Sequence, residues 1–259
     1  MFKRAFLVPA AILLMMTCLA FPPLPAWAQQ PVVVELFTSE GCSSCPPADA
    51  MLTTLSHKRD TGVATLILLE EHVEYWNDGG WTDRFSGPTY TQRQYDYTRE
   101  LHLATPYTPQ IVIDGHLQAS GNNPRAVEQM ILEAAKTPKP AAVSLRLVSP
   151  EKLQVTVDDA AGSKLQVVLA VTEDDLTTNV HGGENGGRTL KHSAVVRELR
   201  PLGTTSSGKF DKTVNLPAKS EWKKQSLRAI VLVQNPNSGL ILGAASTPYP
   251  PESPSAMGR

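Results

Sequence analysis

Cys42 and Cys45 are the residues whose types and spacing point most directly to chemistry. They lie between an apolar segment at 32–37 and a helix-like segment whose apolar positions begin near Met51. In thiol–disulfide exchange the thiolate is the nucleophile, and the free N–H groups and dipole of a helix N-terminus stabilise that anion. Two intervening residues in a first helical turn bring the second sulfur within bonding distance. The spacing therefore predicts that Cys42 forms a mixed disulfide with a substrate and that Cys45 resolves it.

Two consecutive prolines, Pro46 and Pro47, indicate where the helix after the cysteines begins. If Ser44 is the N-cap, both prolines fall in the first turn, where a missing backbone N–H costs no hydrogen bond. We then expect Cys42 to lie just outside the helix, exposed to an attacking partner.

The first 28 residues have the pattern of a secretory signal peptide. Two basic residues at 3–4 precede an apolar run at 5–21, and a small-residue site follows at 26–28. We expect cleavage after residue 28, a periplasmic or secreted protein, and no stable membrane insertion afterwards. A lipoprotein site at Cys18 and a retained membrane anchor are the alternatives, although the apolar run is short for a span.

Cleavage removes Cys18 and leaves Cys42 and Cys45 as the only cysteines. As a structural staple the pair would close a loop of four residues, which chain entropy values at roughly 2 kcal/mol. As a zinc site it would supply half of a ligand set, with no second cysteine pair to complete it. Redox chemistry is the favoured interpretation, and a structural disulfide is the alternative.

Composition and charge are those of a globular protein. The chain has 259 residues, of which 41% are hydrophobic, and a formal net charge of -1. This length allows one large or two ordinary domains. The charge balance gives no indication of a nucleic-acid or acidic-lipid partner.

The segments on either side of residue 70 extend the cysteine-bearing unit. The almost continuous apolar run at 63–69 predicts a buried strand, so residues 32–69 form a βαβ unit. The aromatic segment at 70–81 follows at the end of that strand, where ligands of open α/β sheets bind. There Trp76 and Trp81, with Tyr75, either cover the cysteines as a substrate surface or cap a small core of their own.

A hairpin and a further helix complete the first domain. Residues 110–117 combine an apolar strand, an Asp-Gly turn and a return strand. Pro109 precedes the strand, and a cis Thr108–Pro109 bond is expected there. Asn123 then caps a helix that begins at Pro124, which gives the order β-α-β-α-β-β-α by about residue 136.

These motifs together resemble an exported thioredoxin-like family, catalogued as domain of unknown function 1223, within the thioredoxin superfamily. The resemblance implies the fold strongly and the reaction weakly, because the family's substrate is not established. The motifs are the stretch 35–49 with its Cys-x-x-Cys-Pro-Pro, Tyr75-Trp76, Gly80-Trp81, Arg93-Gln94 and Tyr107-Thr108-Pro109-Gln110.

The resemblance also implies roles for individual residues. Cys42 matches the attacking cysteine and Cys45 the resolving one. Pro109 matches the cis-proline that faces the disulfide, and Thr108 would offer backbone groups to a bound peptide. Glu35 matches the buried acid that relays the proton of the resolving thiol. The loop from Glu35 to the cysteines is one residue longer than in those relatives, so an ordinary strand position is the alternative.

The pattern changes after the stiff linker at 137–140. Short apolar alternations of period two, with no helical pattern, predict an antiparallel β-sandwich. The expected organisation is a signal peptide at 1–28, a thioredoxin-like domain at 29–137, a β-sandwich at 141–246 and a disordered proline-rich tail at 247–259.

One stretch of the second half, residues 180–197, is rich in glycine and histidine. His181, Glu184 and His192 are candidate metal ligands. The favoured interpretation is a loop that packs on the first domain and shapes access to Cys42, so no metal or cofactor is assigned.

The sequence thus predicts an α/β thioredoxin-like domain followed by an all-β antiparallel sandwich. The expected function is thiol–disulfide exchange on a protein or small thiol, with a separate redox partner. A non-catalytic envelope binding or assembly module with a structural disulfide is one alternative. A copper-handling protein is the other, and it would need a further ligand such as His72 or a loop histidine beside the two thiolates.

Overall fold

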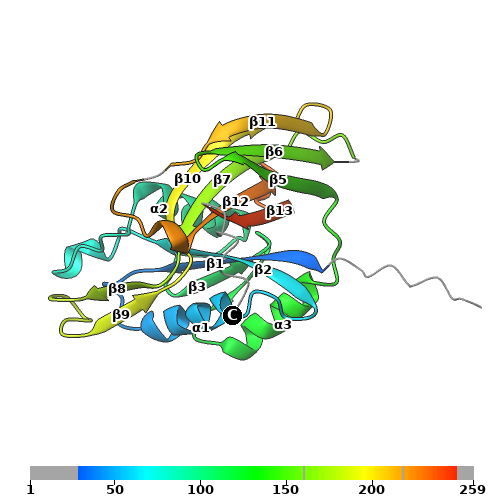
Figure 1. Cartoon of the computed structure of the whole chain (residues 1–259). Helices are drawn as coiled ribbons and strands as arrows, with labels where there is room; N and C mark the ends of the chain where they lie inside the picture. Colours follow the sequence, from blue (N-terminus) through cyan, green and yellow to red (C-terminus); the bar gives the residue numbers. More distant parts are fainter. Residues whose placement is uncertain (1–28, 160, 218, 250–259) are drawn as a thin grey trace, which may run out of the picture.

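The computed structural model describes residues 29–159, 161–217 and 219–249 (Figure 1). The predicted signal peptide lies outside the described residues, as does the predicted tail from residue 250 onward. Within the described part of the chain, no helix is both long enough and apolar enough to cross a membrane.

The first half of the chain has the predicted order of elements. Strands β1 and β2 pair in parallel around α1, and β3 and β4 form the predicted antiparallel hairpin. The Asn123 side chain caps α3 by accepting a hydrogen bond from the backbone N–H of Ala126, as expected from the Asn-Pro pair. The elements are β1 (Gln30–Thr38), α1 (Pro46–Ser56), β2 (Ala64–His72), the 3-10 helix η1 (Asn77–Gly79), α2 (Pro88–Glu100), β3 (Gln110–Ile113), β4 (Leu117–Ser120) and α3 (Pro124–Ala134).

The second half consists of strands with one further 3-10 turn. Thr247 and Pro248, which the sequence assigns to the tail, belong to the last of these strands. The elements are β5 (Ala141–Ser149), β6 (Lys152–Asp159), β7 (Gln166–Glu173), β8 (Leu176–Asn179), β9 (Thr189–His192), β10 (Val195–Thr204), β11 (Lys209–Asn215), η2 (Lys224–Ser226), β12 (Leu227–Gln234) and β13 (Ile241–Pro248).

The predicted fold class is wrong, because the two halves share one sheet. Its eight strands run in the order β13-β12-β7-β10-β2-β1-β3-β4. The halves join where β10 pairs in parallel with β2 at Val195 and Glu70, and the backbone N–H of Glu70 donates to the carbonyl of Ala194 at 2.8 Å. The structure is therefore a mixed, mostly β architecture and not a thioredoxin-like α/β domain followed by a separate sandwich.

The burial of β7 and β12 explains why the apolar pattern of the second half predicted a separate sandwich. Strand β7 is buried from Val167 to Glu173, and β12 is buried at all but one position. Strands buried on both faces belong in the middle of a covered sheet. An apolar pattern identifies such a strand but does not say which neighbour it pairs with.

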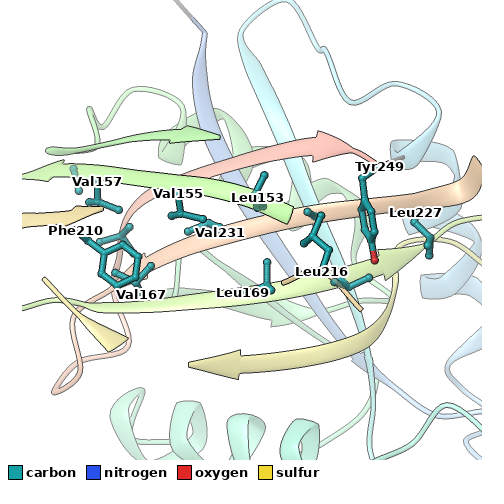
Figure 2. Packing of buried hydrophobic residues seen from close by; sticks show 14 of the residues in the cluster. Leu153, Val155, Val157, Val167, Leu169, Phe210, Leu216, Leu227, Val231 and Tyr249 are labelled. Carbon is teal, nitrogen blue, oxygen red and sulfur yellow. The ribbon is translucent and has the colours of Figure 1, made fainter. Parts of the chain in front are cut away.

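A small sheet and three helices cover the large sheet. The small sheet, with strands in the order β11-β6-β5, packs its apolar side chains against β7 and β12. Figure 2 shows this core, in which Leu153 and Val155 of β6 face Leu169 and Val231. Helices α1 and α3 lie along the β1–β3 part of the sheet (Figure 1), and α2 packs on the other face of these strands.

The two faces of β1 contact different helices. Val34 and Leu36 pack with α1 and α3, whereas Val33 and Phe37 pack with tyrosines of α2. Because successive side chains of a strand point to opposite faces, Glu35 lies on the α2 face. This placement decides which groups Glu35 can reach.

Candidate functional site

Cys42 and Cys45 form a disulfide at the junction between β1 and α1. Their Cα atoms lie 5.4 Å apart, as the predicted spacing requires. Pro46 and Pro47 occupy the first two helical positions, so the prolines start the helix as predicted. The N-cap is Cys45 and not Ser44, and no side chain caps the helix. The disulfide therefore lies directly at the N-terminus of α1.

Cys42 is not exposed, contrary to expectation. Both cysteines have 0% of their surface accessible, while the intervening Ser43 and Ser44 are exposed. The residues that cover the cysteine loop come from two segments far from it in the sequence. A tight turn alone would leave Cys42 open, so its burial is a property of the tertiary structure.

The first covering segment is the Thr108–Pro109 turn. The Thr108 hydroxyl lies 3.2 Å from Cys42 Sγ, and the indole N–H of Trp76 donates to the same hydroxyl oxygen at 2.8 Å. Since an indole N–H can only donate, the Thr108 oxygen accepts from Trp76, and its own proton is directed at the sulfur. A second hydroxyl, that of Ser44, lies 3.3 Å from Cys42 Sγ.

Pro109 lies next to this contact in the predicted cis form. It packs against Gly121, where an added Cβ would lie 3.1 Å from the Pro109 Cβ and 2.8 Å from that of Ala48 in α1. The small residue at 121 thus lets the β3–β4 hairpin approach the helix closely. Among the predicted substrate-binding residues, the structure brings Thr108 and Trp76 to Cys42.

Trp81, in contrast, contacts the residues around the cysteine loop and not Cys42 itself. Its indole N–H donates to Glu40 Oε2 at 2.8 Å. Its ring lies edge-on to His181, with centroids 6.1 Å apart. Trp81 therefore connects the loop before Cys42 to the turn between β8 and β9.

That turn, residues 180–188, is the second covering segment. The Asn185 side-chain N–H₂ donates to the carbonyls of Glu40 and Cys42, both at 2.9 Å. Glu184 Oε2 accepts the backbone N–H of Ser43 at 3.1 Å. Hydrogen bonds from Ser43 lower the pKa of the Glu184 carboxyl. The glycine-rich loop packs over Cys42, as the favoured interpretation of the sequence held.

A glycine makes this docking sterically feasible. A Cβ at Gly182 would lie 2.4 Å from the carbonyl oxygen of Gly80, closer than real Cβ contacts allow. The turn and the loop that carries Trp81 therefore meet backbone to backbone.

Sequence reasoning missed Asn185, although it is the residue of the turn that contacts the cysteine loop most directly. It is fully buried, and Arg188 donates to its side-chain oxygen at 3.0 Å. The available signal was one asparagine flanked by glycine pairs, and this pattern is also typical of an exposed turn.

Glu35 is buried but contacts α2 and not the cysteines. Its carboxylate accepts from Arg93 Nε at 2.5 Å and from the Tyr97 hydroxyl at 2.6 Å. Glu71 lies 3.5 Å from the same guanidinium, and burial together with the Glu35 charge raises its pKa. The structure thus places Glu35 in an ion-pair network on the opposite face of β1 from α1.

A second polar cluster is buried on the α1 side, at the ends of β2 and β9. His72 Nδ1 lies 2.7 Å from Asp83 Oδ2, and His192 Nδ1 lies 2.7 Å from Glu70 Oε1. The two imidazole rings are 5.0 Å apart. The ring nitrogens of His72 face two carboxylates, those of Asp83 and Glu70.

Asp49 links this cluster to the helix of the cysteines. It lies one turn after Cys45 and accepts the Thr38 hydroxyl at 2.6 Å. Burial and the nearby Glu70 carboxylate raise the pKa of Asp49 to about 7. Residues 180–197 hold three candidate metal ligands. Of these, His192 enters the cluster, while His181 and Glu184 are exposed.

A separate cleft lies away from the cysteines. It has a volume of about 530 Å³ and opens between α2 and strands β7, β10 and β12, with Arg93, Tyr97 and Gln234 in its wall. The cysteines do not line it.

Comparison with known proteins identifies relatives of the whole arrangement. The family model described as "Protein of unknown function (DUF1223)" matches residues 33–234. This match spans both halves of the chain, including the strands that join the shared sheet. A search of curated proteins gave no match.

Two solved structures resemble the chain over most of its length. A crystal structure from Agrobacterium tumefaciens shares 29% identity with a TM-score of 0.67, covering 85% of this chain and 95% of that chain. HBP35 of Porphyromonas gingivalis has a TM-score of 0.65 at 18% identity, covering 89% of this chain and 79% of that chain. The second likeness concerns the fold alone.

Proposed function

The chain belongs to the family described as protein of unknown function (DUF1223), and within it we propose that Cys42 and Cys45 form a thiol–disulfide exchange site. A substrate thiolate attacks Cys42 Sγ, a mixed disulfide forms, and Cys45 leaves as the thiolate. A second substrate thiolate then attacks the substrate sulfur and releases Cys42. Two electrons pass from the substrate to the cysteine pair, and each step is reversible.

The observation that carries this proposal is the hydroxyl of Thr108 at 3.2 Å from Cys42 Sγ. The indole N–H of Trp76 donates to the oxygen of that hydroxyl, so the hydroxyl proton of Thr108 remains directed at the sulfur. Hydrogen-bond donors and a helix N-terminus favour the thiolate over the thiol. A sulfur with this environment is a better leaving and attacking group than a cysteine in an apolar core.

Access to the sulfurs requires movement of the turn at 180–188. Asn185 and Glu184 hold this turn against the backbone of the cysteine loop through three hydrogen bonds. Glu184 and Ser43 are exposed, so that part of the contact is within reach of water. The proposed substrate is a protein or small thiol that enters when this turn is displaced.

We also propose that exchange takes place outside the cytoplasm with a separate redox partner. This proposal is supported by the signal-peptide pattern of residues 1–28 and by a pair that is left as the only two cysteines after cleavage. Disulfides persist in oxidising compartments, which is consistent with such a location.

The test is the equilibrium reduction potential of the pair in the purified chain from residue 29 onward. The protein is equilibrated in glutathione buffers of graded potential, and the free thiols are alkylated and counted by mass spectrometry. Exchange proteins have potentials between about -270 and -120 mV, and we expect a value in this range. A value below about -300 mV would instead indicate a structural disulfide and favour the non-catalytic binding module.

A trapping experiment identifies the attacking sulfur. Cys45→Ser should accumulate a mixed disulfide with glutathione on Cys42, because the resolving thiol is missing. Cys42→Ser is the matched control and should accumulate much less of it. Equal trapping in the two variants would contradict the assigned roles.

A further inference from the structure

We propose that Glu70, His72 and His192 form a buried site for a divalent transition-metal ion. One ligand atom from each residue lies within 4.8 Å of the other two. All three side chains are buried, with at most 1% of their surface accessible. The site lies beneath the loop that leads to Cys42 and does not depend on the proposed exchange reaction.

The hydrogen bonds of His72 leave one of its nitrogens free for a metal. Asp83 Oδ2 accepts the backbone N–H of Glu40 at 2.8 Å and lies 2.7 Å from His72 Nδ1. Asp83 Oδ1 accepts the backbone N–H of Phe85 at 2.9 Å, so the group is held as a carboxylate acceptor. His72 Nδ1 therefore carries the proton, and the lone pair of the neutral ring is on Nε2. Metal-ligating histidines are oriented by carboxylates in this way.

His192 faces Glu70 through its Nδ1, so the three ligand atoms that lie together are Glu70 Oε1, His72 Nε2 and His192 Nδ1. His192 Nδ1 lies 2.7 Å from Glu70 Oε1, while Glu70 Oε2 accepts the backbone N–H of Ser193 at 2.9 Å. His72 Nε2 is buried and has no hydrogen-bonding partner among the described residues. A buried polar atom without a partner costs about 1–3 kcal/mol, and a bound ion would remove that cost.

One carboxylate oxygen of Glu70 lies close to both ring nitrogens. Glu70 Oε1 is 3.5 Å from His72 Nε2 and 2.7 Å from His192 Nδ1. Two ligands of one tetrahedral ion lie about 3.4 Å apart when each is about 2.1 Å from it.

The charges in this region also favour a cation. Four acidic side chains are buried around the two imidazoles, namely Glu40, Asp49, Glu70 and Asp83. These carboxyl groups outnumber the two imidazoles. Burying uncompensated charge is strongly unfavourable. A divalent ion would offset negative charge at this place.

The donor set selects the class of ion. Imidazole nitrogens combined with carboxylate oxygens suit Zn²⁺, Mn²⁺, Fe²⁺ or Co²⁺, whereas Mg²⁺ and Ca²⁺ prefer oxygen ligands alone and Cu⁺ prefers sulfur. Sites closed to solvent are typical of structural metals. The ion would tie β9 to the end of β2 and would thereby anchor the hairpin whose turn covers Cys42.

The test uses the chain from residue 29 onward with its disulfide intact. After removal of metal with a chelator, Co²⁺ and Zn²⁺ are added separately, and binding is followed by calorimetry and by the visible absorption of Co²⁺. We expect one ion per chain, a Co²⁺ spectrum without thiolate charge-transfer bands, and a higher melting temperature with Zn²⁺. A wild-type chain that binds neither Co²⁺, Zn²⁺, Mn²⁺ nor Fe²⁺ overturns the proposal.

Two variants locate the ion. His192→Gln should weaken binding by about 100-fold or more, because it removes a ligand. His181→Gln, in the same hairpin but outside the cluster, is the matched control and should bind as the wild type does. Loss of affinity in His181→Gln alone would overturn the assignment.

Two further measurements keep the test decisive. Cys42→Ser/Cys45→Ser should retain one bound ion, whereas loss of the ion in this variant would place the metal at the cysteines and overturn the site. If His192→Gln does not fold, the Co²⁺ spectrum of the wild type identifies the donor atoms. A thiolate charge-transfer band in that spectrum would contradict the proposed nitrogen and oxygen ligands.

Discussion

The hydroxyl of Thr108 bridges the indole N–H of Trp76 and the sulfur of Cys42, at 2.8 and 3.2 Å respectively. Thr108 precedes β3, and Trp76 follows β2, so the bridge joins two separate segments over the N-terminus of α1. It fixes the direction of the hydroxyl proton and thereby the electrostatic environment of the sulfur.

Replacing Thr108 by valine tests this bridge. Thr108→Val keeps the shape of the side chain and removes the donor, so the thiolate of reduced Cys42 loses one hydrogen bond. We expect alkylation of reduced Cys42 by iodoacetamide at neutral pH to slow by about tenfold. Thr54→Val, at an exposed position of α1, is the matched control and should leave the rate unchanged. An unchanged rate in Thr108→Val would show that the hydroxyl does not act on the sulfur.

Asn185 should control both stability and access to the disulfide. Asn185→Ala removes the donor that serves the carbonyls of Glu40 and Cys42. We expect the free energy of unfolding to fall by about 1–3 kcal/mol and the disulfide to be reduced faster by dithiothreitol. Asn179→Ala, exposed in the same hairpin, serves as control in denaturant unfolding and reduction kinetics. If Asn185→Ala is reduced at the wild-type rate, the turn is not what limits access.

The contact of Glu184 with Ser43 should make access depend on pH. Because hydrogen bonds from Ser43 lower the pKa of Glu184, the contact is fully present above the ordinary carboxyl pKa. It is lost as the pH falls through the lowered pKa, where the carboxylate becomes protonated. Reduction of the disulfide by a phosphine should therefore accelerate between neutral pH and about pH 3.

Glu184→Gln provides the control for this pH dependence. The amide oxygen can still accept from Ser43 but does not titrate in that range, so the acceleration should be much smaller. The same acceleration in wild type and variant would assign the effect to another group.

Glu35 offers a test that separates stability from reactivity. Glu35→Gln breaks a buried ion pair with Arg93 and leaves the guanidinium without its closest carboxylate. We expect a loss of about 3–5 kcal/mol in the free energy of unfolding and no change in the alkylation rate of reduced Cys42. A slower disulfide exchange at full stability would instead support the proton-relay role that the resemblance implies.

The local elements around the cysteines followed from the sequence alone. The strand before Cys42, the helix that begins at Pro46, the cis bond before Pro109 and the cap at Asn123 each depend on residues close together in the chain. Proline and asparagine restrict the backbone or satisfy its hydrogen bonds wherever they occur. Such features can be predicted without knowledge of long-range contacts.

The tertiary structure decided which elements meet. The single backbone pairing of Val195 with Glu70 merges two predicted domains into one sheet, and no local pattern specifies the partner of a strand. The same pairing brings the β8–β9 hairpin to Cys42 and places His192 next to His72. Hydrophobic alternation records only that a side chain is buried. The burial of Cys42, the role of Asn185 and the polar cluster depend on contacts between segments distant in the chain, and packing alone creates them.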